Sequence, residues 1–249
     1  NGSASRFAPE LFESLGAQVV ALSCGPNGRN INAGCGALFP QAMQRAVVKH
    51  DADAGICFDG DADRAIFADE KGALLDGDSI ICLGAQRLRR QGLLRNGKVV
   101  LTVMSNFGLV KSLRDQGIDV VSVPVGDRNV SEAIEREGLS IGGEASGHII
   151  FRSFAVTGDG MLTALQTFVA LRESGRPLSD TRRMFRAVPQ VLENLHVDVK
   201  PSLRDLPGLQ QAIGRCEREL HGQGRVFLRY SGTEPLLRIM VEGPNQAKV

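Results

Sequence analysis

The sequence predicts an α/β protein in which two successive α/β domains with mixed sheets precede a small C-terminal α+β domain. Two observations favour this class. Segments with the apolar spacing of helices alternate with short apolar runs over residues 8–174, which is the order that builds α/β layers. After a cluster of turn residues at 176–180, the order becomes one strand, one helix and two strands, as expected for a small α+β domain.

The first domain is expected over residues 1–74. Its opening helix precedes Gly16, and glycine commonly ends helices. Its second helix has Pro40 in the first turn, where proline is well tolerated. The predicted elements are helices at 8–15 and 40–50, a buried strand at 18–22, and strands at 54–58 and 65–68.

The second domain is expected over residues 75–185, and the third over residues 186–249. Helical spacing again alternates with apolar runs in the second domain. Its predicted elements are helices at 79–91, 107–116, 129–137 and 160–173, with strands at 98–103, 119–123 and on both sides of Gly142-Gly143. Those of the third domain are a strand at 191–199, a helix at 209–220 and strands at 225–230 and 236–242.

Both ends of the chain look cut. Asn1-Gly2 resembles the turn that follows a strand, and residues 246–249 resemble the start of a helix. We therefore expect a fragment of a longer protein, whose C-terminal domain is also truncated.

Composition excludes several classes of protein. The 249 residues carry 29 basic and 28 acidic side chains, so a net charge of +1 provides no overall field for nucleic acid or a membrane surface. No apolar run approaches the roughly 18 residues of a membrane span, and we expect a cytoplasmic protein with neither nucleic acid nor membrane as partner. Five widely spaced cysteines without a Cys-x-x-Cys pair argue against a disulfide framework and a zinc site.

An acidic segment between two apolar strands is the strongest candidate for chemistry. Asp59, Asp61 and Asp63 alternate along the chain, so in extended geometry their carboxylates point to one side. At about 4 Å separation and an effective dielectric constant near 20, each pair of charges repels by on the order of 4 kcal/mol. A bound Mg²⁺ would neutralise them and keep positions for water or phosphate. The alternative is a solvated acidic turn.

A calcium-binding EF-hand is a further alternative for this segment. The three aspartates match its positions one, three and five, and Glu70 falls at position twelve. Position six, which needs a glycine for the turn, is Arg64. The flanking segments also read as strands, so a calcium sensor is not expected.

A glycine-rich segment, Gly142-Gly-Glu-Ala-Ser-Gly-His148, offers a second set of polar groups. Glu144, Ser146 and His148 supply an acceptor, a hydroxyl and a titratable ring on a backbone that bends easily. Such a loop can bind sugar hydroxyls. It can equally be a turn whose polar side chains cap the next element. Upstream, Arg128 is a further candidate contact for an anion or substrate.

The C-terminal candidate is the segment Arg229-Tyr-Ser-Gly-Thr-Glu-Pro235. A guanidinium, the hydroxyls of Ser231 and Thr233, and the backbone amides around Gly232 can converge on one phosphate. Arg238 is close enough in sequence to contribute. The alternative is an ordinary hairpin turn with an exposed arginine.

Together, the three loops resemble those of the α-D-phosphohexomutase superfamily, in order and over essentially the whole chain. Within it, the similarity is greatest to the phosphoglucosamine mutase family. The strings that carry this resemblance are NINAGCGALFP, VGDRNV, GGEASGHIIF, TGDGMLTALQ and RYSGTEPLLRIMVEG.

The resemblance implies domains two, three and four of a four-domain enzyme. It implies Asp59, Asp61 and Asp63 as magnesium ligands, and Glu144 and Ser146 as readers of sugar hydroxyls. Arg64 and His148 then match groups near the transferred phosphoryl. The loop that grips the phosphate that does not react corresponds to Arg229, Ser231, Gly232 and Thr233.

The implied reaction interconverts glucosamine 6-phosphate and glucosamine 1-phosphate in cell-wall amino-sugar synthesis. A phosphorylated serine of the first domain, in a Ser-His-Asn motif, would donate its phosphoryl group, with glucosamine 1,6-bisphosphate or glucose 1,6-bisphosphate as intermediate or activator. No Ser-His-Asn occurs in this sequence, so the chain alone is expected to be inactive. Ala145 also departs from the longer side chain usual in relatives. The resemblance is compatible with a homodimer.

Three alternatives stay open on sequence. A phosphomannomutase/phosphoglucomutase of the same superfamily differs only in sugar preference. A non-catalytic phosphosugar-binding fragment would bind without turnover. A haloacid-dehalogenase-type phosphatase also combines an aspartate loop with magnesium, but its nucleophile loop continues with threonine or valine rather than with Asp63-Arg64.

Overall fold

The computed structural model describes residues 1–232 and 234–246 and divides into two units. The first unit contains Asn1–Ser105 and Leu109–Phe185, and the second contains Asn106–Gly108 and the chain from Arg186 onward. The predicted helix start at 246–249 lies almost wholly outside the described residues. Within the described part of the chain, no helix has the length and apolar character needed to cross a membrane.

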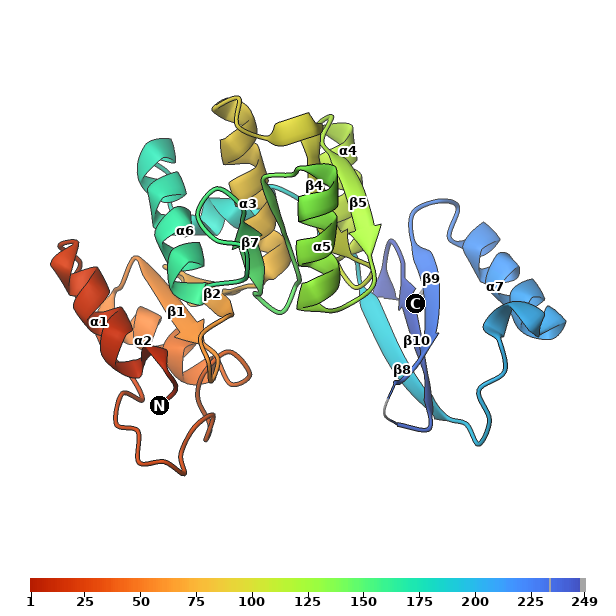
Figure 1. Ribbon diagram of the computed structural model, residues 1–249, viewed down its shortest axis with the longest axis horizontal. Coiled ribbons are helices and arrows are strands. Elements are labelled where there is room, and N and C mark those ends of the chain that lie inside the picture. The colour runs from red at the N-terminus through yellow and green to blue at the C-terminus, as the bar shows by residue number, and fades with distance from the viewer. Residues whose placement is uncertain (233, 247–249) are drawn as a thin grey trace. The chain divides into compact units, whose positions relative to one another are not determined.

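The first sheet is built from three antiparallel strands in the order β1-β2-β3. Short hairpin connections join its strands, and two helices, α1 and α2, accompany it in the red and orange part of the chain (Figure 1). The elements are α1 (Ala4–Ser14), α2 (Gln41–His50), β1 (Ala54–Phe58), β2 (Ala65–Asp69) and β3 (Leu74–Leu75).

Close packing of α2 on β1 depends on a glycine. A Cβ atom at Gly55 would lie 2.3 Å from the sulfur of Met43 and 2.6 Å from Cγ2 of Val47. Both of these helix side chains are buried. Any larger residue at position 55 would therefore push α2 away from the strand.

The predicted strand at residues 18–22 is wrong. These residues form neither strand nor helix, and Val20 and Leu22 are 50% and 43% exposed. An apolar run becomes a strand only where a neighbouring strand accepts its backbone hydrogen bonds. In the described residues, the first sheet contains only β1, β2 and β3.

The second sheet has the mixed orientation expected. Its order is β5-β4-β6-β7, with β4 parallel to β5 and β6, and β6 antiparallel to β7. The strands are β4 (Lys98–Thr102), β5 (Asp119–Val123), β6 (Ile141–Gly143) and β7 (Ile149–Phe151). The helices are α3 (Gly77–Arg90), α4 (Phe107–Asp115), α5 (Asp127–Glu137) and α6 (Gly160–Ser174), with the 3₁₀ helices η1 (Arg95–Gly97) and η2 (Leu178–Arg183).

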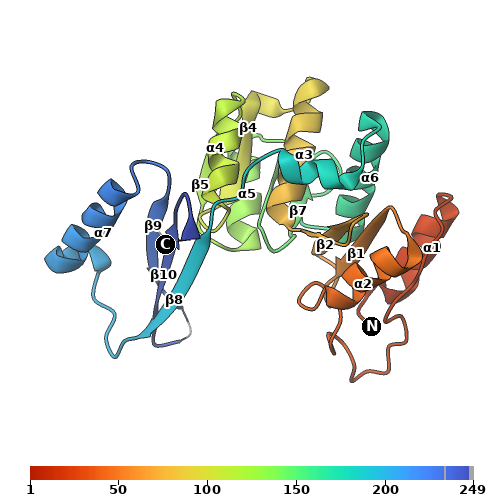
Figure 2. The same cartoon turned by 180° about the vertical axis from the view of Figure 1, so that it is seen from behind.

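Successive side chains of β4 point to opposite faces of the sheet and pack into two different hydrophobic cores. Val99 and Leu101 join the large core that also contains Phe67 of the first sheet, whereas Val100 joins a smaller core with Ile134 of α5. Figure 1 shows α5 in front of the sheet, and in Figure 2, the view from behind, α5 lies on the far side. The large core runs through both sheets, so they form one compact unit.

The second unit is a small α+β domain around one antiparallel sheet. Its strand order is β8-β10-β9. The elements are β8 (Gln190–His196), η3 (Leu203–Asp205), α7 (Pro207–Glu219), β9 (Arg225–Tyr230) and β10 (Leu236–Glu242). The predicted fold class is thus confirmed, and the difference in detail is that the first sheet is antiparallel rather than mixed, because its strands are joined by hairpins.

Candidate active site and its relatives

The acidic loop is the connection between β1 and β2. Asp59 follows the last residue of β1, and the chain turns at Ala62, whose φ of 66° is in the left-handed region. Each of Asp59, Asp61 and Asp63 offers one carboxylate oxygen, and these oxygens lie within 4.8 Å of one another. The structure thus brings all three predicted metal ligands together.

Arg64 is the counter-charge within this loop. Its Nε lies 3.6 Å from carboxylate oxygens of both Asp59 and Asp63, and its backbone N–H donates to Oδ1 of Asp59. Burial, followed by a hydrogen bond with Asp63, raises the pKa of Asp59, while Arg64 acts in the opposite direction. One guanidinium therefore offsets only part of the charge of three carboxylates.

The donor set fits a hard divalent cation. Oδ1 of Asp63 is buried and has no hydrogen-bond partner among the described residues. Magnesium binds oxygen ligands at about 2.0–2.1 Å, which puts opposite ligands about 4.2 Å apart. Adjacent ligands of the octahedron are about 2.9 Å apart, so oxygens that lie within 4.8 Å of one another would have to close by up to about 2 Å to share an ion.

His148 lies against the acidic loop. Its side chain is almost completely buried, its Nε2 is 3.8 Å from Oδ2 of Asp63, and its Nδ1 has no hydrogen-bond partner in the described part of the chain. Arg64 and His148 also pair as an isolated antiparallel bridge, next to a hydrogen bond from Ala65 N–H to the Gly147 carbonyl. The two loops are therefore joined through their backbones.

The glycine-rich loop connects β6 to β7. The backbone N–H of Glu144 donates to the His148 carbonyl at 2.9 Å, and that of Gly147 donates to the Glu144 carbonyl at 3.0 Å. Oε1 of Glu144 accepts from the N–H of Gly126, and Oε2 lies 3.4 Å from Oγ of Ser146. Glu144 thus holds its own loop to the start of α5, and Ser146 is exposed beside it.

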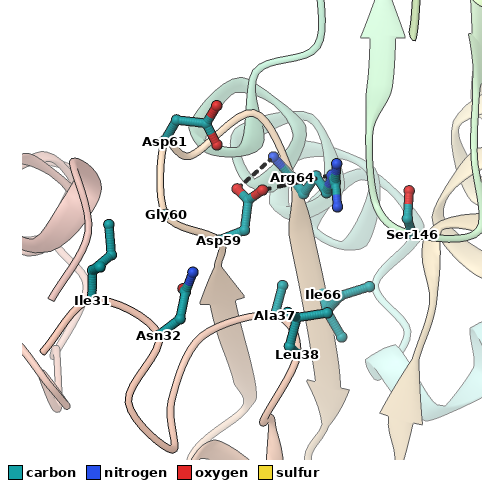
Figure 3. Close-up of a pocket in the computed structure, with 10 residues that line it drawn as sticks. All are labelled: Ile31, Asn32, Ala37, Leu38, Asp59, Gly60, Asp61, Arg64, Ile66 and Ser146. Carbon is teal, nitrogen blue, oxygen red and sulfur yellow. Dashed lines mark hydrogen bonds and ion pairs between the residues drawn. The ribbon is translucent and has the colours of Figure 1, made fainter. Parts of the chain in front are cut away.

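Both loops line one cavity of about 510 Å³ (Figure 3). Asp59, Asp61 and Arg64 come from the acidic loop, and Ser146 comes from the glycine-rich loop. The remaining lining residues are Ile31, Asn32, Ala37, Leu38, Gly60 and Ile66. A polar end with charged groups and an apolar wall is typical of a small-molecule site.

Sequence reasoning missed the residues from 31–38 that line this cavity. They belong to a long connection without helix or strand, so neither periodicity nor charge singled them out. The only signal was their place within the string NINAGCGALFP. Asn32 has a φ of 56°, and asparagine is among the residues that tolerate this region best.

Arg128 does not line the cavity. It lies in the first turn of α5, where its Nε is 2.6 Å from Oε1 of Glu132 and its side chain is exposed. Its loop does reach the glycine-rich loop, because Gly126 contacts Glu144. A substrate contact by Arg128 remains a prediction.

The phosphate-loop candidates lie in the second unit. Arg229 is in β9, directly opposite Arg238 of β10, and the buried Ser231 follows the end of β9. Gly232 is exposed at the turn. Thr233 lies outside the described residues.

The family of this chain follows from comparison with known proteins. Residues 1–72 match the family model of phosphoglucomutase/phosphomannomutase, alpha/beta/alpha domain II, and residues 76–188 match alpha/beta/alpha domain III. Residues 192–249 match the C-terminal domain of the same family. The three models occur in order and leave only short gaps.

Curated relatives align over the whole chain. The phosphoglucosamine mutases of Solibacter usitatus and Rhodospirillum centenum are each 49% identical to it over 249 and 251 residues. The chain is covered completely, but it spans only 56% and 53% of their lengths.

Solved structures share the fold at low identity. Aspergillus fumigatus N-acetylphosphoglucosamine mutase, in complex with GlcNAc-6P and magnesium, has a TM-score of 0.75 at 22% identity, covering 98% of this chain and 57% of that one. A phosphoglucomutase/phosphomannomutase family protein from Burkholderia thailandensis has a TM-score of 0.75 at 21% identity, covering 99% and 55%. Domain models, relatives and fold agree, and the chain belongs to the α-D-phosphohexomutase superfamily.

Proposed function

We propose that this chain is the metal-, sugar- and phosphate-binding part of a phosphosugar mutase that interconverts glucosamine 6-phosphate and glucosamine 1-phosphate. The observation that carries the proposal is the shared cavity. Asp59 and Asp61, two of the three converging aspartates, line it from one loop, and the hydroxyl-bearing Ser146 lines it from another. The relatives at 49% identity are phosphoglucosamine mutases, which supports the choice of sugar.

Asp59, Asp61 and Asp63 would hold Mg²⁺, since their oxygens are close enough to share one ion. When bound, the ion would neutralise negative charge on the phosphoryl group as it moves between oxygens. Arg64 would add positive charge on the same side of the cavity. His148 would lie near the moving phosphoryl, held in place by its buried position beside Asp63.

Other residues would bind the parts of the substrate that do not react. Glu144 and Ser146 would accept from and donate to sugar hydroxyls, and Arg128 would be a further contact. Phosphate at the far end of the sugar would be held by a set that combines guanidinium groups, hydroxyls and backbone amides. This set is Arg229, Ser231, Gly232, Thr233 and Arg238.

The reaction needs a phosphoryl donor that these residues do not provide. A phosphoserine in a Ser-His-Asn motif would transfer its phosphoryl to the free hydroxyl of the sugar phosphate, forming a bisphosphate. After the sugar reorients, its other phosphoryl would return to the serine. The sequence contains no Ser-His-Asn, so we expect the 249 residues alone to bind phosphosugar without turnover.

A coupled mutase assay with Mg²⁺ and catalytic glucose 1,6-bisphosphate tests the proposal. We expect no glucosamine 1-phosphate from this chain alone, and turnover when it is joined to the serine-bearing first domain of a phosphoglucosamine mutase. Turnover by the chain alone would mean that the nucleophile lies within these 249 residues and not in a serine-bearing first domain. Faster turnover of mannose or glucose phosphates than of glucosamine phosphate by the joined protein would favour the phosphomannomutase/phosphoglucomutase alternative.

A further inference from the structure

The turn between β9 and β10 gathers more positive charge than the sequence motif suggests. Arg229 and Arg238 are paired directly across the two strands, so their side chains share one face of the sheet. Like charges in that position are destabilising. The Nζ of Lys200 adds a third positive charge at the same turn, because it donates to the Ser231 carbonyl at 2.6 Å.

The carboxylate of Glu234 contacts this cluster at Arg238. Oε2 of Glu234 accepts a hydrogen bond from Nη2 of Arg238 at 2.6 Å and lies 3.4 Å from Oγ of Ser231. A single anionic oxygen is therefore shared by a guanidinium and a hydroxyl. Those are two of the groups that the proposed function assigns to a substrate phosphate.

The guanidinium of Arg238 is not saturated by this contact. Its Nε has no hydrogen-bond partner among the described residues. Phosphate accepts two parallel hydrogen bonds from arginine better than one carboxylate oxygen does. Glu234 thus accepts from only part of the Arg238 guanidinium, and an anion that accepts more of its hydrogen bonds can bind there more strongly.

An ordinary surface ion pair is the simpler interpretation. Side chains of Arg238 and Glu234 are 35% and 52% exposed and four residues apart, and such pairs contribute little. That interpretation accounts for the arginine contact, and the backbone N–H of Glu234, which donates to Oγ of Ser231 at 3.2 Å, brings the same residue close to the hydroxyl of the buried Ser231. Both contacts are expected if the carboxylate occupies an anion position.

We propose that Glu234 is an internal competitor for the phosphate site. Without ligand, its carboxylate occupies the position of a phosphate oxygen against Arg238 and Ser231, and a phosphate group has to displace it. Glu234 thereby weakens the grip on the distal phosphate, which helps a sugar bisphosphate leave the clamp and turn round. This inference rests on the proposed function, since it assigns a phosphate to this turn.

The test measures binding of inorganic phosphate and of glucosamine 6-phosphate to the 249-residue chain by isothermal titration. Glu234→Gln keeps the shape and the backbone hydrogen bond from the residue 234 amide to Ser231, but removes the charge. We expect its Kd for both probes to fall by roughly two- to fivefold, the range of exposed ion pairs. The Kd values of Glu234→Ala for both probes should also fall.

Asp115→Asn is the matched control. Asp115 pairs with Lys111 at 2.8 Å with the same four-residue spacing, and it belongs to the first unit. The variant removes the same net charge, and we expect it to leave both Kd values unchanged. If the Kd values of Asp115→Asn fall as much as those of Glu234→Gln, the effect comes from net charge and the proposal is overturned.

Further outcomes separate this inference from the proposed function. Arg229→Gln should abolish phosphate binding if the phosphate site is correctly placed. If it does so while Glu234→Gln binds no more tightly than the unchanged chain, Glu234 is only a structural partner of Arg238. If no form of the chain binds phosphate, both the inference and the phosphate site are wrong. Far-UV circular dichroism establishes that each variant is folded.

Discussion

At the scale of single residues, repulsion among the three carboxylates of the acidic loop is offset in part by one cation, the guanidinium of Arg64. Asp61 is the most exposed of the three aspartates, and Arg64 contacts the other two. Asp61 therefore has the least compensation from the protein and the most to gain from a metal ion. It can be changed without removing a buried group, so its effects on metal binding and on folding can be told apart.

Asp61→Asn should weaken Mg²⁺ binding at least about tenfold, or ~1.4 kcal/mol, because one anionic ligand is lost. The metal-free variant should be at least as stable as the unchanged protein, because repulsion within the loop is reduced. Isothermal titration and thermal melting with and without Mg²⁺ measure the two effects. Asp53→Asn, an exposed aspartate before β1, is the control. An undiminished Mg²⁺ response in Asp61→Asn would contradict the assignment of the site.

Gly158 packs directly against the imidazole of His148. A Cβ atom at residue 158 would lie 2.3 Å from Nε2 of the imidazole, whereas one at Gly208 in α7 would meet nothing within 4 Å. Gly158→Ala should lower the free energy of unfolding by about 1–3 kcal/mol, the cost of overpacking a dense core. Gly208→Ala should be neutral or slightly stabilising, as alanine favours helix. Urea unfolding measures the free energy of unfolding of both variants. Equal values would show that the imidazole of His148 moves aside without cost.

At the scale of elements, an ion pair between two side chains links helix α3 to helix α6. Nε and Nη2 of Arg87 in α3 donate to the two carboxylate oxygens of Glu173 in α6 at 2.8 and 2.9 Å. Hydrogen bonding by Arg87 lowers the pKa of Glu173 below its usual value near 4.5. Because the Glu173 side chain is 42% exposed, solvent screening keeps its contribution to stability small.

A pH dependence follows from the sign of that shift. A carboxyl whose pKa is lowered in the folded state stabilises the protein above its unfolded pKa, near 4.5, and this stabilisation is lost as the pH falls through the folded value. Glu173→Gln should therefore cost under about 1 kcal/mol at pH 7, and this cost should shrink as the pH falls below 4.5 and through the lowered folded pKa. Urea unfolding over this range measures the difference, with the exposed Glu13 changed to Gln as control. A constant difference at every pH would rule out the charge as its origin.

At the scale of the whole molecule, the two units differ greatly in the size of their cores. The large core of the first unit runs through two sheets and several helices. Among the described residues of the second unit, the buried apolar side chains are only Leu220, Leu237 and Met240, and α7 buries none of its residues. Small domains with little buried surface are marginally stable, so the second unit should unfold first.

Differential scanning calorimetry should resolve two transitions, because each unit has its own sheet and core. Mg²⁺ should raise the midpoint of the higher transition, since the aspartates lie in the first unit. Phosphate should raise only the lower one, since Arg229 lies in the second unit. Ligands stabilise the unit that binds them according to their concentration relative to Kd. A single transition that both ligands shift equally would mean that the units unfold as one.

Local sequence signals were sufficient for most of the elements. Strands 54–58, 119–123, 225–230 and 236–242 match β1, β5, β9 and β10 residue for residue, because apolar runs between turn residues leave few other arrangements. Helix ends differ by up to four residues, as they depend on capping. The segment 18–22 failed because pairing with a neighbouring strand, which pattern alone does not record, decides whether an apolar run becomes a strand.

The sequence by itself determined the alternating order of elements, the fold class and the three aspartates, because residue type and spacing already constrain backbone conformation and charge. Only the tertiary structure decided that Ser146 faces the same cavity as Asp59, that His148 is buried against Asp63, that Arg128 pairs with Glu132, and that Glu234 contacts Arg238. The physical reason is that contacts between residues far apart in the chain, and the directions of long flexible side chains, depend on packing of the whole fold.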